Sequence, residues 1–436
     1  MKRDRSGSFS WVSRDGKIII AARGVRTFGQ GFIAIILAVY LAKLGFSLAQ
    51  IGAFISVGVA GSAFWVFLES FVATRVGRRR LLVVFTFMTA GAALGLVATN
   101  SFVLLLVFSF LGSLSSGAMA TGPAQPLEMA SLADAASPAR RTNLFATYRI
   151  VATGAGAVGA LAAGLPVLYQ RAFGLSEVSA YKVMFLGFVL CLLLVVLLYA
   201  LLSPAVEAGA KQEGLTNPFR LPSRRVIFTL AGLFSVDALA GTLVPQTLAA
   251  YWFNTKFGLQ LSSLAPIFFF SQVLAATSLW AAARIAARIG LINTIVFTHI
   301  PSSLFLIAAA FAPTAWMAVM FWQLRAFFGQ MDVPTRDSYT MAIVRPEERV
   351  AMASIHTVGR SVAGTVGPSA GTALWQAISA SAPFVACAAI KIAYDLSLYF
   401  MFRKVRTPEE EERARSRSAI ESREPAPGQA PEVSMR

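Results

Sequence analysis

Residues 203–225 read SPAVEAGAKQEGLTNPFRLPSRR, the longest polar interruption between the apolar runs of this chain. Six apolar runs precede it and six follow it, each with the roughly 20 residues that a helix needs to cross a bilayer core. Proline, glycine and mixed charges inside the interruption are typical of a linker between two folded units. The sequence therefore predicts an all-α polytopic membrane protein, in which twelve transmembrane helices form two pseudo-symmetric six-helix bundles.

The apolar runs are too long for barrel strands and lack the alternation of apolar and polar residues that such strands show. They lie at about residues 27–45, 50–72, 81–99, 102–126, 144–169, 182–203, 226–252, 262–283, 291–311, 314–335, 352–378 and 381–402. The predicted organisation is a cytoplasmic segment 1–26, a bundle 27–203, a cytoplasmic linker 204–225, a second bundle 226–402 and a charged, partly disordered cytoplasmic tail 403–436.

The composition excludes an ordinary soluble enzyme. Of 436 residues, 56% are hydrophobic and 14% charged, with mean hydropathy +0.65, whereas soluble domains carry about 25% charged residues. Cys191 and Cys387 both lie inside apolar runs, so they form no disulfide scaffold. The sequence has neither a nucleotide-binding glycine loop after a strand nor a nucleophile with a histidine base. We therefore predict no enzymatic activity, no cofactor and no metal site.

The positive charges lie mainly on one side of the predicted membrane. Of the 38 Lys and Arg residues, 30 fall in the segments that share a side with both termini and 4 fall in the loops of the other side. Short loops rich in Lys and Arg stay in the cytoplasm, which predicts a multi-pass protein of the cell membrane with both termini cytoplasmic. The same scatter over seven short segments excludes nucleic-acid binding. The expected partners are the lipid bilayer, a small-molecule substrate and protons, and the chain is expected to be a monomer.

The two halves resemble each other in sequence. A shift of 208 residues, without gaps, superposes proline on proline, arginine on arginine and glycine on glycine. The matching pairs are Pro126 and Pro334, Pro138 and Pro346, Arg141 and Arg349, Gly156 and Gly364, and Gly159 and Gly367. Repeats of this kind are typical of transporters whose substrate site lies near the bilayer midplane, between the halves.

One loop carries a family signature. Residues 74–80 (TRVGRRR) resemble the Asp-Arg-x-Gly-Arg-Arg pattern of the major facilitator superfamily, with Thr74 in place of the aspartate and Ser70 in place of the preceding glycine. The matching residues are Arg75, Gly77, Arg78 and Arg79. A weaker copy, residues 287–290 (ARIG), lies at the equivalent place in the second half. The resemblance implies a secondary transporter that works by alternating access.

A second motif is similar to an element of the drug–proton antiporters in that family. Residues 367–371 (GPSAG) resemble the family's Gly-Pro-x-x-Gly-Gly element, and residues 159–164 (GALAAG) are a version without the proline. Physically, small residues let neighbouring helices approach closely, and general membrane packing is the alternative explanation. For the signature loop, Gly77 permits a tight turn and the arginines stay at the headgroups. A role as a topology anchor alone remains the alternative there.

Two charges lie deep in predicted helices. A charge at the centre of a spanning helix costs about 2.5 to 3.5 kcal/mol, so Asp237 and Arg325 are expected to face a cavity or each other. We predict Asp237 as the proton carrier, because desolvation and a nearby guanidinium act on a carboxyl group in opposite directions. A static ion pair is the alternative. Arg26 and Gln30 lie on one face with Arg23, and either line the inner vestibule or extend to the membrane surface.

Further charges are predicted to form a cytoplasmic gate. Arg325, Gly329, Asp332 and Arg336 are spaced by four, three and four residues, which places them on one face of a continuous helix. We expect ion pairs between the bundles to close the cavity when it opens outward. The gate residues are Glu128, Asp332, Arg336, Asp337, Arg149 and Arg360. A charge ring at headgroup level that never switches is the alternative.

The predicted function is secondary active transport of a small organic solute, with proton-coupled efflux by antiport preferred. Proton-coupled uptake of an organic anion is the alternative, because arginines outnumber acids among the candidate inner residues. Metal export and a membrane-embedded lipid-modifying enzyme or scaffold rank below both. A metal site would need more imidazole or thiolate ligands than the sequence offers, and His299 is expected to be a packing residue.

Overall fold

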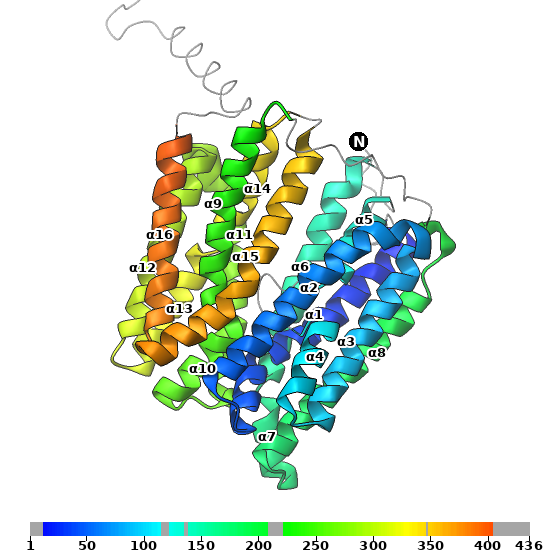
Figure 1. The fold of residues 1–436 in the computed structure, drawn as a ribbon, viewed down its shortest axis with the longest axis vertical. Helices are drawn as coiled ribbons and strands as arrows, with labels where there is room; N and C mark the ends of the chain where they lie inside the picture. Colours follow the sequence, from blue (N-terminus) through cyan, green and yellow to red (C-terminus); the bar gives the residue numbers. More distant parts are fainter. Residues whose placement is uncertain (1–11, 115–121, 135–137, 208–220, 346–347, 404–436) are drawn as a thin grey trace, which may run out of the picture.

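The computed structural model describes residues 12–114, 122–134, 138–207, 221–345 and 348–403. Within these ranges the chain forms sixteen α-helices and one short 3-10 helix, with no strand. Figure 1 shows two bundles side by side, α1 to α8 in one and α9 to α16 in the other. Nine of the described helical segments are long and apolar enough to cross a membrane. The prediction of an all-α polytopic membrane protein is therefore confirmed.

The first bundle begins earlier than hydropathy predicts. Its helices are α1 (Arg14–Lys43), α2 (Leu48–Val76), α3 (Arg78–Ala98), α4 (Phe102–Gly112), α5 (Ala124–Asp134), α6 (Pro138–Ala162), α7 (Leu165–Phe173) and α8 (Glu177–Ala200), followed by η1 (Pro204–Glu207). We placed the start of the first spanning helix near residue 27. Helix α1 instead starts at Arg14, because the Ser13 side chain caps it by accepting the backbone N–H of Gly16 at 3.1 Å.

The second bundle repeats this layout. Its helices are α9 (Arg224–Leu243), α10 (Gln246–Phe257), α11 (Leu261–Ile289), α12 (Leu291–Phe311), α13 (Ala315–Phe328), α14 (Asp332–Ile343), α15 (Arg349–Ala377) and α16 (Ala382–Phe402). Helices α11 and α12 meet at Gly290, whose φ of +87° matches the +95° of Gly77 between α2 and α3. Both turns require the left-handed backbone that glycine adopts without strain.

Several apolar runs are broken helices. Helix α4 ends at Gly112, before Ser113 with φ of +51°, and α13 ends at Phe328, before α14 starts at Asp332. Hydropathy averages over such breaks, so the runs 102–126 and 314–335 read as single helices. These two runs correspond under the 208-residue repeat, and paired interruptions of this kind mark substrate sites in transporters. The second break also separates Arg325 from Asp332 and Arg336, so the continuous stripe predicted there is wrong.

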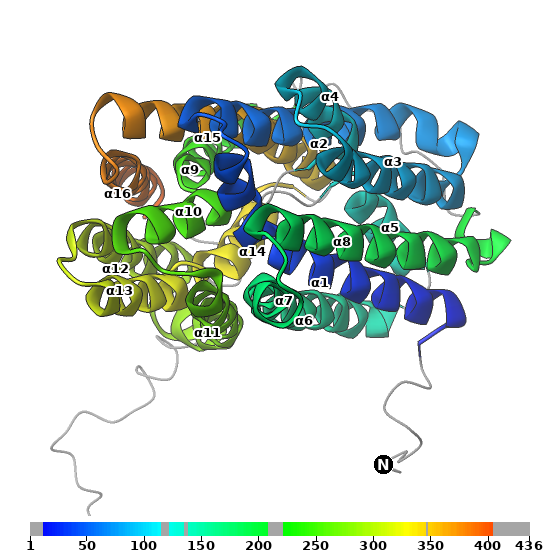
Figure 2. The same cartoon turned by 90° about the horizontal axis from the view of Figure 1, so that it is seen from below.

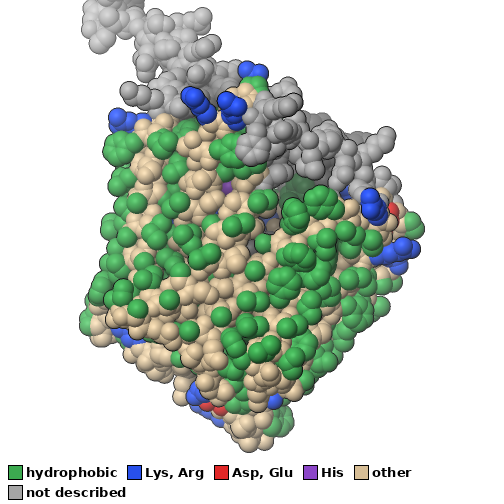
Figure 3. Space-filling model, viewed as in Figure 1, with side chains coloured by type: hydrophobic (Ala, Val, Ile, Leu, Met, Phe, Trp, Pro, Cys, Tyr) green, Lys and Arg blue, Asp and Glu red, His purple; other side chains and the backbone are tan. Residues whose placement is uncertain are grey.

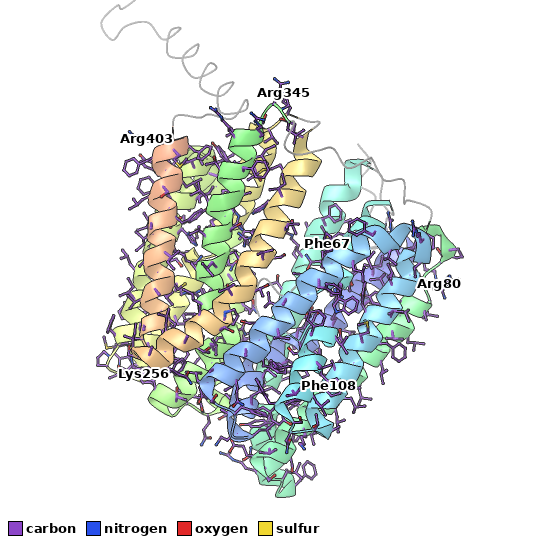
Figure 4. All side chains as sticks on the ribbon, viewed as in Figure 1. Phe67, Arg80, Phe108, Lys256, Arg345 and Arg403 are labelled. Carbon is purple, nitrogen blue, oxygen red and sulfur yellow. The ribbon has the colours of Figure 1, made fainter. Side chains whose placement is uncertain are left out.

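The outer surface of both bundles is apolar. Figure 3 shows Lys and Arg at the two ends of the molecule, with a wide hydrophobic band between them on this face. Large side chains such as Phe67, Val103, Phe311 and Val362 are exposed. Figure 4 shows Arg80, Arg345 and Arg403 at one end of the bundles and Lys256 at the other. This arrangement fits a lipid bilayer around the middle of the molecule.

The two bundles touch at one end of the molecule. We call the end where α1 begins and α16 ends the terminal face, and the other end the opposite face (Figure 1). Figure 2 shows α2 beside α15 and α6 beside α11. The Ser56 hydroxyl of α2 accepts hydrogen bonds from the backbone N–H and the hydroxyl of Ser369 in α15, at 3.0 and 2.9 Å. Gly52 packs on Thr372 one turn nearer the opposite face, so this face is the closed one.

Helices α15 and α9 also pack closely, through the glycines of the GPSAG motif. A Cβ on Gly371 would lie 2.0 Å from the carbonyl oxygen of Leu243, and one on Gly367 would lie 2.0 Å from the Thr242 hydroxyl. Both contacts flank the point where α9 ends and Val244 and Pro245 lead into α10. Glycine at these positions therefore lets α15 support the break in the α9–α10 segment.

Replacing Gly371 by alanine tests this packing. The added Cβ must displace backbone atoms of Leu243, so we expect a loss of about 1 to 3 kcal/mol in the free energy of unfolding. The matched control is Gly91→Ala in α3, where no atom lies within 4 Å of the added carbon. Thermal unfolding of the two purified variants in lipid nanodiscs gives the comparison. Equal melting temperatures would contradict the close packing of α15 on α9.

Candidate functional site

A cavity of about 410 Å³ lies between the bundles. Helices α1 and α6 of the first bundle line one wall, and α9 to α13 with α16 line the other. Its lining on α1 runs from Arg23 to Ala34, and the next turns of α1 join a shared apolar core with α10 that includes Tyr40 and Trp252. The core lies toward the opposite face, so the cavity lies on the terminal-face side of it. Figure 3 shows a hollow between the bundles on that side.

The charged lining of the cavity is cationic. Arg23 comes from the first bundle, whereas Arg325 and Lys391 come from the second, and no carboxylate lines the cavity among the described residues. The guanidinium of Arg325 lies 4.6 Å from the ring centroid of Trp322, another lining residue. In the described part of the chain no acidic side chain pairs with Arg325. An unpaired guanidinium in a cavity wall is available to bind an anion.

Uncharged polar groups and two aromatic rings complete the cavity. Amides and hydroxyls give it donors and acceptors on both walls, and Phe268 and Trp322 supply flat apolar surface. The polar groups are Thr27, Gln30, Thr153, Gln246, Ser271, Gln272, Ser302, Ser303 and Gln330. The amide nitrogen of Gln246 and the Ser303 hydroxyl are buried without a hydrogen-bond partner. Such a lining suits a small polar solute with an anionic group and a flat apolar part.

Behind the cavity wall, Asp237 is the centre of a charge network. Its carboxylate accepts hydrogen bonds from Lys391 Nζ at 2.6 Å, Arg336 Nη1 at 3.2 Å and Arg360 Nη1 at 3.3 Å. Arg336 also donates to Asp332 at 2.9 Å. Asp237 is 4% exposed, so its charge depends on these partners. The network holds four helices of the second bundle, α9, α14, α15 and α16, at one point.

His299 extends this network along the cavity. Its Nδ1 lies 2.9 Å from Asp395 Oδ1, and its Nε2 lies 3.1 Å from Lys391 Nζ. Lys391 and Asp395 are four residues apart on α16, so one helical face presents both to the imidazole of α12. The ring is 3% exposed and also lines the cavity.

The first bundle holds a simpler network of opposite polarity. Arg26 of α1 donates to Glu128 of α5 at 2.5 Å, and Glu128 also accepts hydrogen bonds from the hydroxyls of Tyr148 and Tyr199. Glu128 is 0% exposed. Under the 208-residue repeat Glu128 corresponds to Arg336. Each bundle therefore has an ion pair of this kind, between α1 and α5 in the first bundle and between α9 and α14 in the second. Position 128 is the acid of its pair, whereas the equivalent position 336 is the base of its pair.

The predicted cavity residues divide between the cavity and its support. Arg325 and Gln30 line the cavity, as expected for residues facing it. Asp237 does not line the cavity and contacts it only through Lys391 and His299. Arg26 lies behind the wall, paired with Glu128. Asp237 and Arg325 do not contact each other in the described structure, so their transport roles stay predictions.

The ion pairs described for the predicted gate residues lie within each bundle. Glu128 pairs with Arg26, and Asp332, Arg336 and Arg360 belong to the Asp237 network. Arg149 is exposed on α6, and the side chain of Asp337 lies outside the described residues. The terminal face is the open one here, so this structure does not test pairing across a closed gate.

The signature loop is held by an acid from the interdomain segment. Gly77 adopts φ of +95°, and the Glu207 carboxylate accepts the backbone N–H groups of Arg78 and Arg79 at 2.7 and 3.2 Å. The Arg79 guanidinium donates to the carbonyl of Ala200, and Arg75 is exposed. The loop has threonine where the family pattern has aspartate, and Glu207 places a carboxylate at the start of α3.

Sequence analysis missed four residues of these networks. The sequence patterns single out neither Lys391, Asp395 nor Glu207, and they predict His299 as a packing residue. Lys391 and Asp395 are charged residues four positions apart in an apolar helix, a pattern that is visible in the sequence. No sequence signal links them to His299, 92 and 96 residues away.

Two helical bundles around a central polar cavity define a transporter. The chain belongs to the major facilitator superfamily, whose family model matches residues 19–329. This confirms the family resemblance of the signature loop and shows a transporter, not an enzyme. The drug–proton antiporter branch is not specifically supported.

Individual proteins are similar over most of the chain. The uncharacterized membrane protein YJR124C of Saccharomyces cerevisiae is 24% identical over 392 residues, which cover 83% of this chain and 88% of that protein. The nucleoside transporter NupG has a TM-score of 0.71 at 14% identity, over 89% of this chain and 99% of NupG. An autoinhibited peptide transporter of the POT family has a TM-score of 0.72 at 11% identity, over 91% and 98%.

A third solved structure is a bacterial homolog of the human lysosomal transporter Spinster, in an inward-facing and occupied conformation. Its TM-score is 0.69 at 16% identity, over 91% of this chain and 97% of that one. At these identities the solved structures show a shared fold and no shared substrate.

Removing the central carboxylate tests the Asp237 network. Asp237→Asn leaves three buried cations short of a counter-charge, so we expect a loss of about 3 to 5 kcal/mol in unfolding free energy. Adding Lys391→Gln should restore part of the loss, because one uncompensated cation is removed. Chemical denaturation of the purified variants measures both effects.

The control for this test is Glu177→Gln. Glu177 pairs with Lys43 at 2.8 Å, and 39% and 47% of their side chains are exposed, so about 0 to 1 kcal/mol is expected. Equal losses for Asp237→Asn and Glu177→Gln would refute a structural role for the network.

Proposed function

We propose that this protein carries a small organic anion together with protons by alternating access. We place it in the cell membrane as a monomer with both termini in the cytoplasm, so that the terminal face is the cytoplasmic one. The conformation described here is then inward-open. The excess of Lys and Arg in the segments on the side of the termini supports this orientation.

One observation carries the choice of an anion. Arg23, Arg325 and Lys391 line the cavity, and the described lining has no carboxylate. A cationic drug would have to enter a low-dielectric cavity next to Arg23 and Arg325, for which no ion pair with a described acid is seen, and this is unfavourable at any realistic dielectric constant. An anion is attracted by both, and Arg325 offers a paired set of N–H donors for a carboxylate or phosphate.

Protons follow from the energetics of moving an anion inward. Each negative charge carried into a cell against 100 mV costs about 2.3 kcal/mol. Protons moving with the anion cancel this cost and add the energy of the proton gradient. The cavity is bordered by a network of acids and an imidazole that can exchange protons, around Asp237 and His299. Uptake by symport is therefore the function that this geometry supports best.

Proton-coupled efflux by antiport is the second candidate. It is supported by the GPSAG motif, residues 367–371. This motif packs on α9, the helix that carries Asp237, next to the break between α9 and α10. In this scheme Asp237 is the proton carrier, and it becomes available to protons when Lys391 leaves it. The two candidates differ in the direction of proton and substrate movement.

The gate remains part of the proposal. Closure of the terminal face brings α5 and α6 of the first bundle toward α14 and α15 of the second. Glu128, Arg149, Asp332, Arg336, Asp337 and Arg360 then exchange partners within their bundles for partners across the gap. Sequential exchange of this kind keeps every charge compensated throughout the movement.

Ligand-dependent stability tests the choice of an anion. We expect at least one organic anion from a panel of benzoate, succinate, glucose 6-phosphate and uridine monophosphate to raise the melting temperature. The gain should correspond to about 2.7 kcal/mol at a hundred times the dissociation constant. Arg325→Gln should abolish it, whereas Arg171→Gln, an exposed residue on α7, should not. Stabilisation by tetraphenylphosphonium and by no anion would reject the proposal.

Imposed gradients test the direction. In right-side-out vesicles, with the stabilising anion as labelled substrate, an inwardly directed proton gradient should drive accumulation, and an uncoupler should abolish it. Vesicles that hold Arg325→Gln protein are the control. Accumulation driven only by an outwardly directed proton gradient would instead support antiport.

A further inference from the structure

His299 has a hydrogen-bonding environment that fixes where its protons lie. The Lys391 ammonium has donors and no acceptor, so at 3.1 Å it requires Nε2 of His299 to be the acceptor. The Asp395 carboxylate accepts at 2.9 Å, so Nδ1 must carry the ring proton. With Lys391 and Asp395 both charged, only the neutral ring protonated on Nδ1 satisfies both contacts.

Among the described residues of this cluster, the formal charges balance only while the ring is neutral. Asp237, Asp332 and Asp395 carry three negative charges, and Arg336, Arg360 and Lys391 carry three positive ones. A proton on Nε2 adds an uncompensated positive charge to this described cluster, and it places two donors against each other at the Lys391–His299 contact. The ammonium must then move away from the ring. It can keep its contact with Asp237, now at 2.6 Å, or enter the cavity that it already lines.

Other groups around His299 act on this step. From α16, Asp395 favours the doubly protonated ring, Lys391 opposes it, and the Tyr394 ring lies edge-on at 6.2 Å. From α9, Asp237 Oδ1 lies 4.0 Å from Nε2 and also favours it. Arg336 on α14 and Arg325 on α13 add positive charge, and α11 carries charge only at Arg284 and Arg288. The second oxygen of Asp395 is buried without a described hydrogen-bond partner, so no other group shares its charge.

We propose that His299 is the proton-binding site of the cavity, and that a proton on Nε2 releases Lys391 to bind the substrate anion. The inference rests on the proposed transport of an anion and assigns the proton to a residue within that site. An anion in the cavity compensates the added positive charge, so each ligand increases the affinity for the other. Linkage makes this coupling reciprocal, and that reciprocity is what symport requires.

This assignment differs from the one based on Asp237. Asp237 contacts three cations within 3.3 Å, whereas His299 has a single cationic contact that can leave. Asp237 then acts as the counter-ion that receives or releases Lys391. Its substitution disturbs the fold, while substitution of His299 removes the site of proton binding itself.

Nitrogen NMR of the imidazole tests the proposal without a substrate. The chain has two histidines, so His356→Gln protein labelled with ¹⁵N-histidine in lipid nanodiscs gives the signals of His299 alone. We expect the neutral ring to be protonated on Nδ1, and acidification to add the second proton on Nε2. If His356→Gln protein does not fold, the wild-type protein gives two sets of ring signals, and the set lost in His299→Gln identifies this ring.

The Lys391 ammonium gives a second readout in protein that is labelled with both ¹⁵N-histidine and ¹⁵N-lysine. The resonance that disappears in Lys391→Arg identifies its Nζ among the eight lysines. We expect this resonance to shift with the same midpoint as the second protonation of His299. A neutral ring protonated on Nε2, a ring that takes up no second proton on acidification, or a Lys391 signal that does not change with that protonation would each overturn the proposal.

A third variant separates this proposal from the anion site. Arg325→Gln should abolish stabilisation by the anion but retain the second protonation of His299 and the linked response of Lys391, because no described contact joins Arg325 to either residue. Loss of the positive charge of Arg325 favours that protonation. Loss of anion binding with a normal titration refutes neither proposal. A normal anion response with no second protonation of His299 refutes the proton site alone.

Discussion

The arrangement of both bundles depends on one constraint: a charge buried in an apolar helix needs a partner within its own bundle. The ion pair of Arg26 and Glu128 connects α1 with α5, and the ion pair of Asp237 and Arg336 connects α9 with α14. The polarity of the pair is reversed between the halves. Because neither pair crosses the interface, the bundles can separate at the terminal face without leaving a buried charge uncompensated, which would cost several kcal/mol. In the open state of the terminal face, each of these pairs is therefore complete within its own bundle.

The composition of the cavity lining follows from this pairing of charges within each bundle. The acids of the second bundle are occupied behind the wall, so the cavity itself presents mainly cations, amides and hydroxyls. Lys391 belongs to both regions, since it donates to Asp237 and lines the cavity. His299 occupies the same boundary, with Asp395 on one side and Lys391 on the other. A change of protonation at this boundary alters the charge of the wall by moving Lys391, while Asp237 keeps its contacts with Arg336 and Arg360.

Much of the architecture could be predicted from the sequence, because membrane spans, a polar linker and the distribution of Lys and Arg are local properties. The signature loop indicated the family, and Arg325 lines the cavity as expected, whereas Asp237 lies behind its wall. The transport roles of both residues stay predictions. The pairing could not be predicted, since Arg26 and Glu128 lie 102 residues apart. Helix breaks at Ser113 and near Gly329 were missed because hydropathy depends on composition and not on backbone angles. His299 reads as a packing residue until α16 places Lys391 and Asp395 beside it.

The closed opposite face is held in a different manner, and this has a kinetic consequence. Ser56 and Ser369 meet through hydroxyl and backbone groups, and Gly52 packs on Thr372. Water can replace these hydrogen bonds as they separate, and each is worth only about 0.5 to 1.5 kcal/mol. The activation barrier for opening the opposite face therefore contains little ionic work, and salt concentration should influence the opening and closing of the terminal face far more.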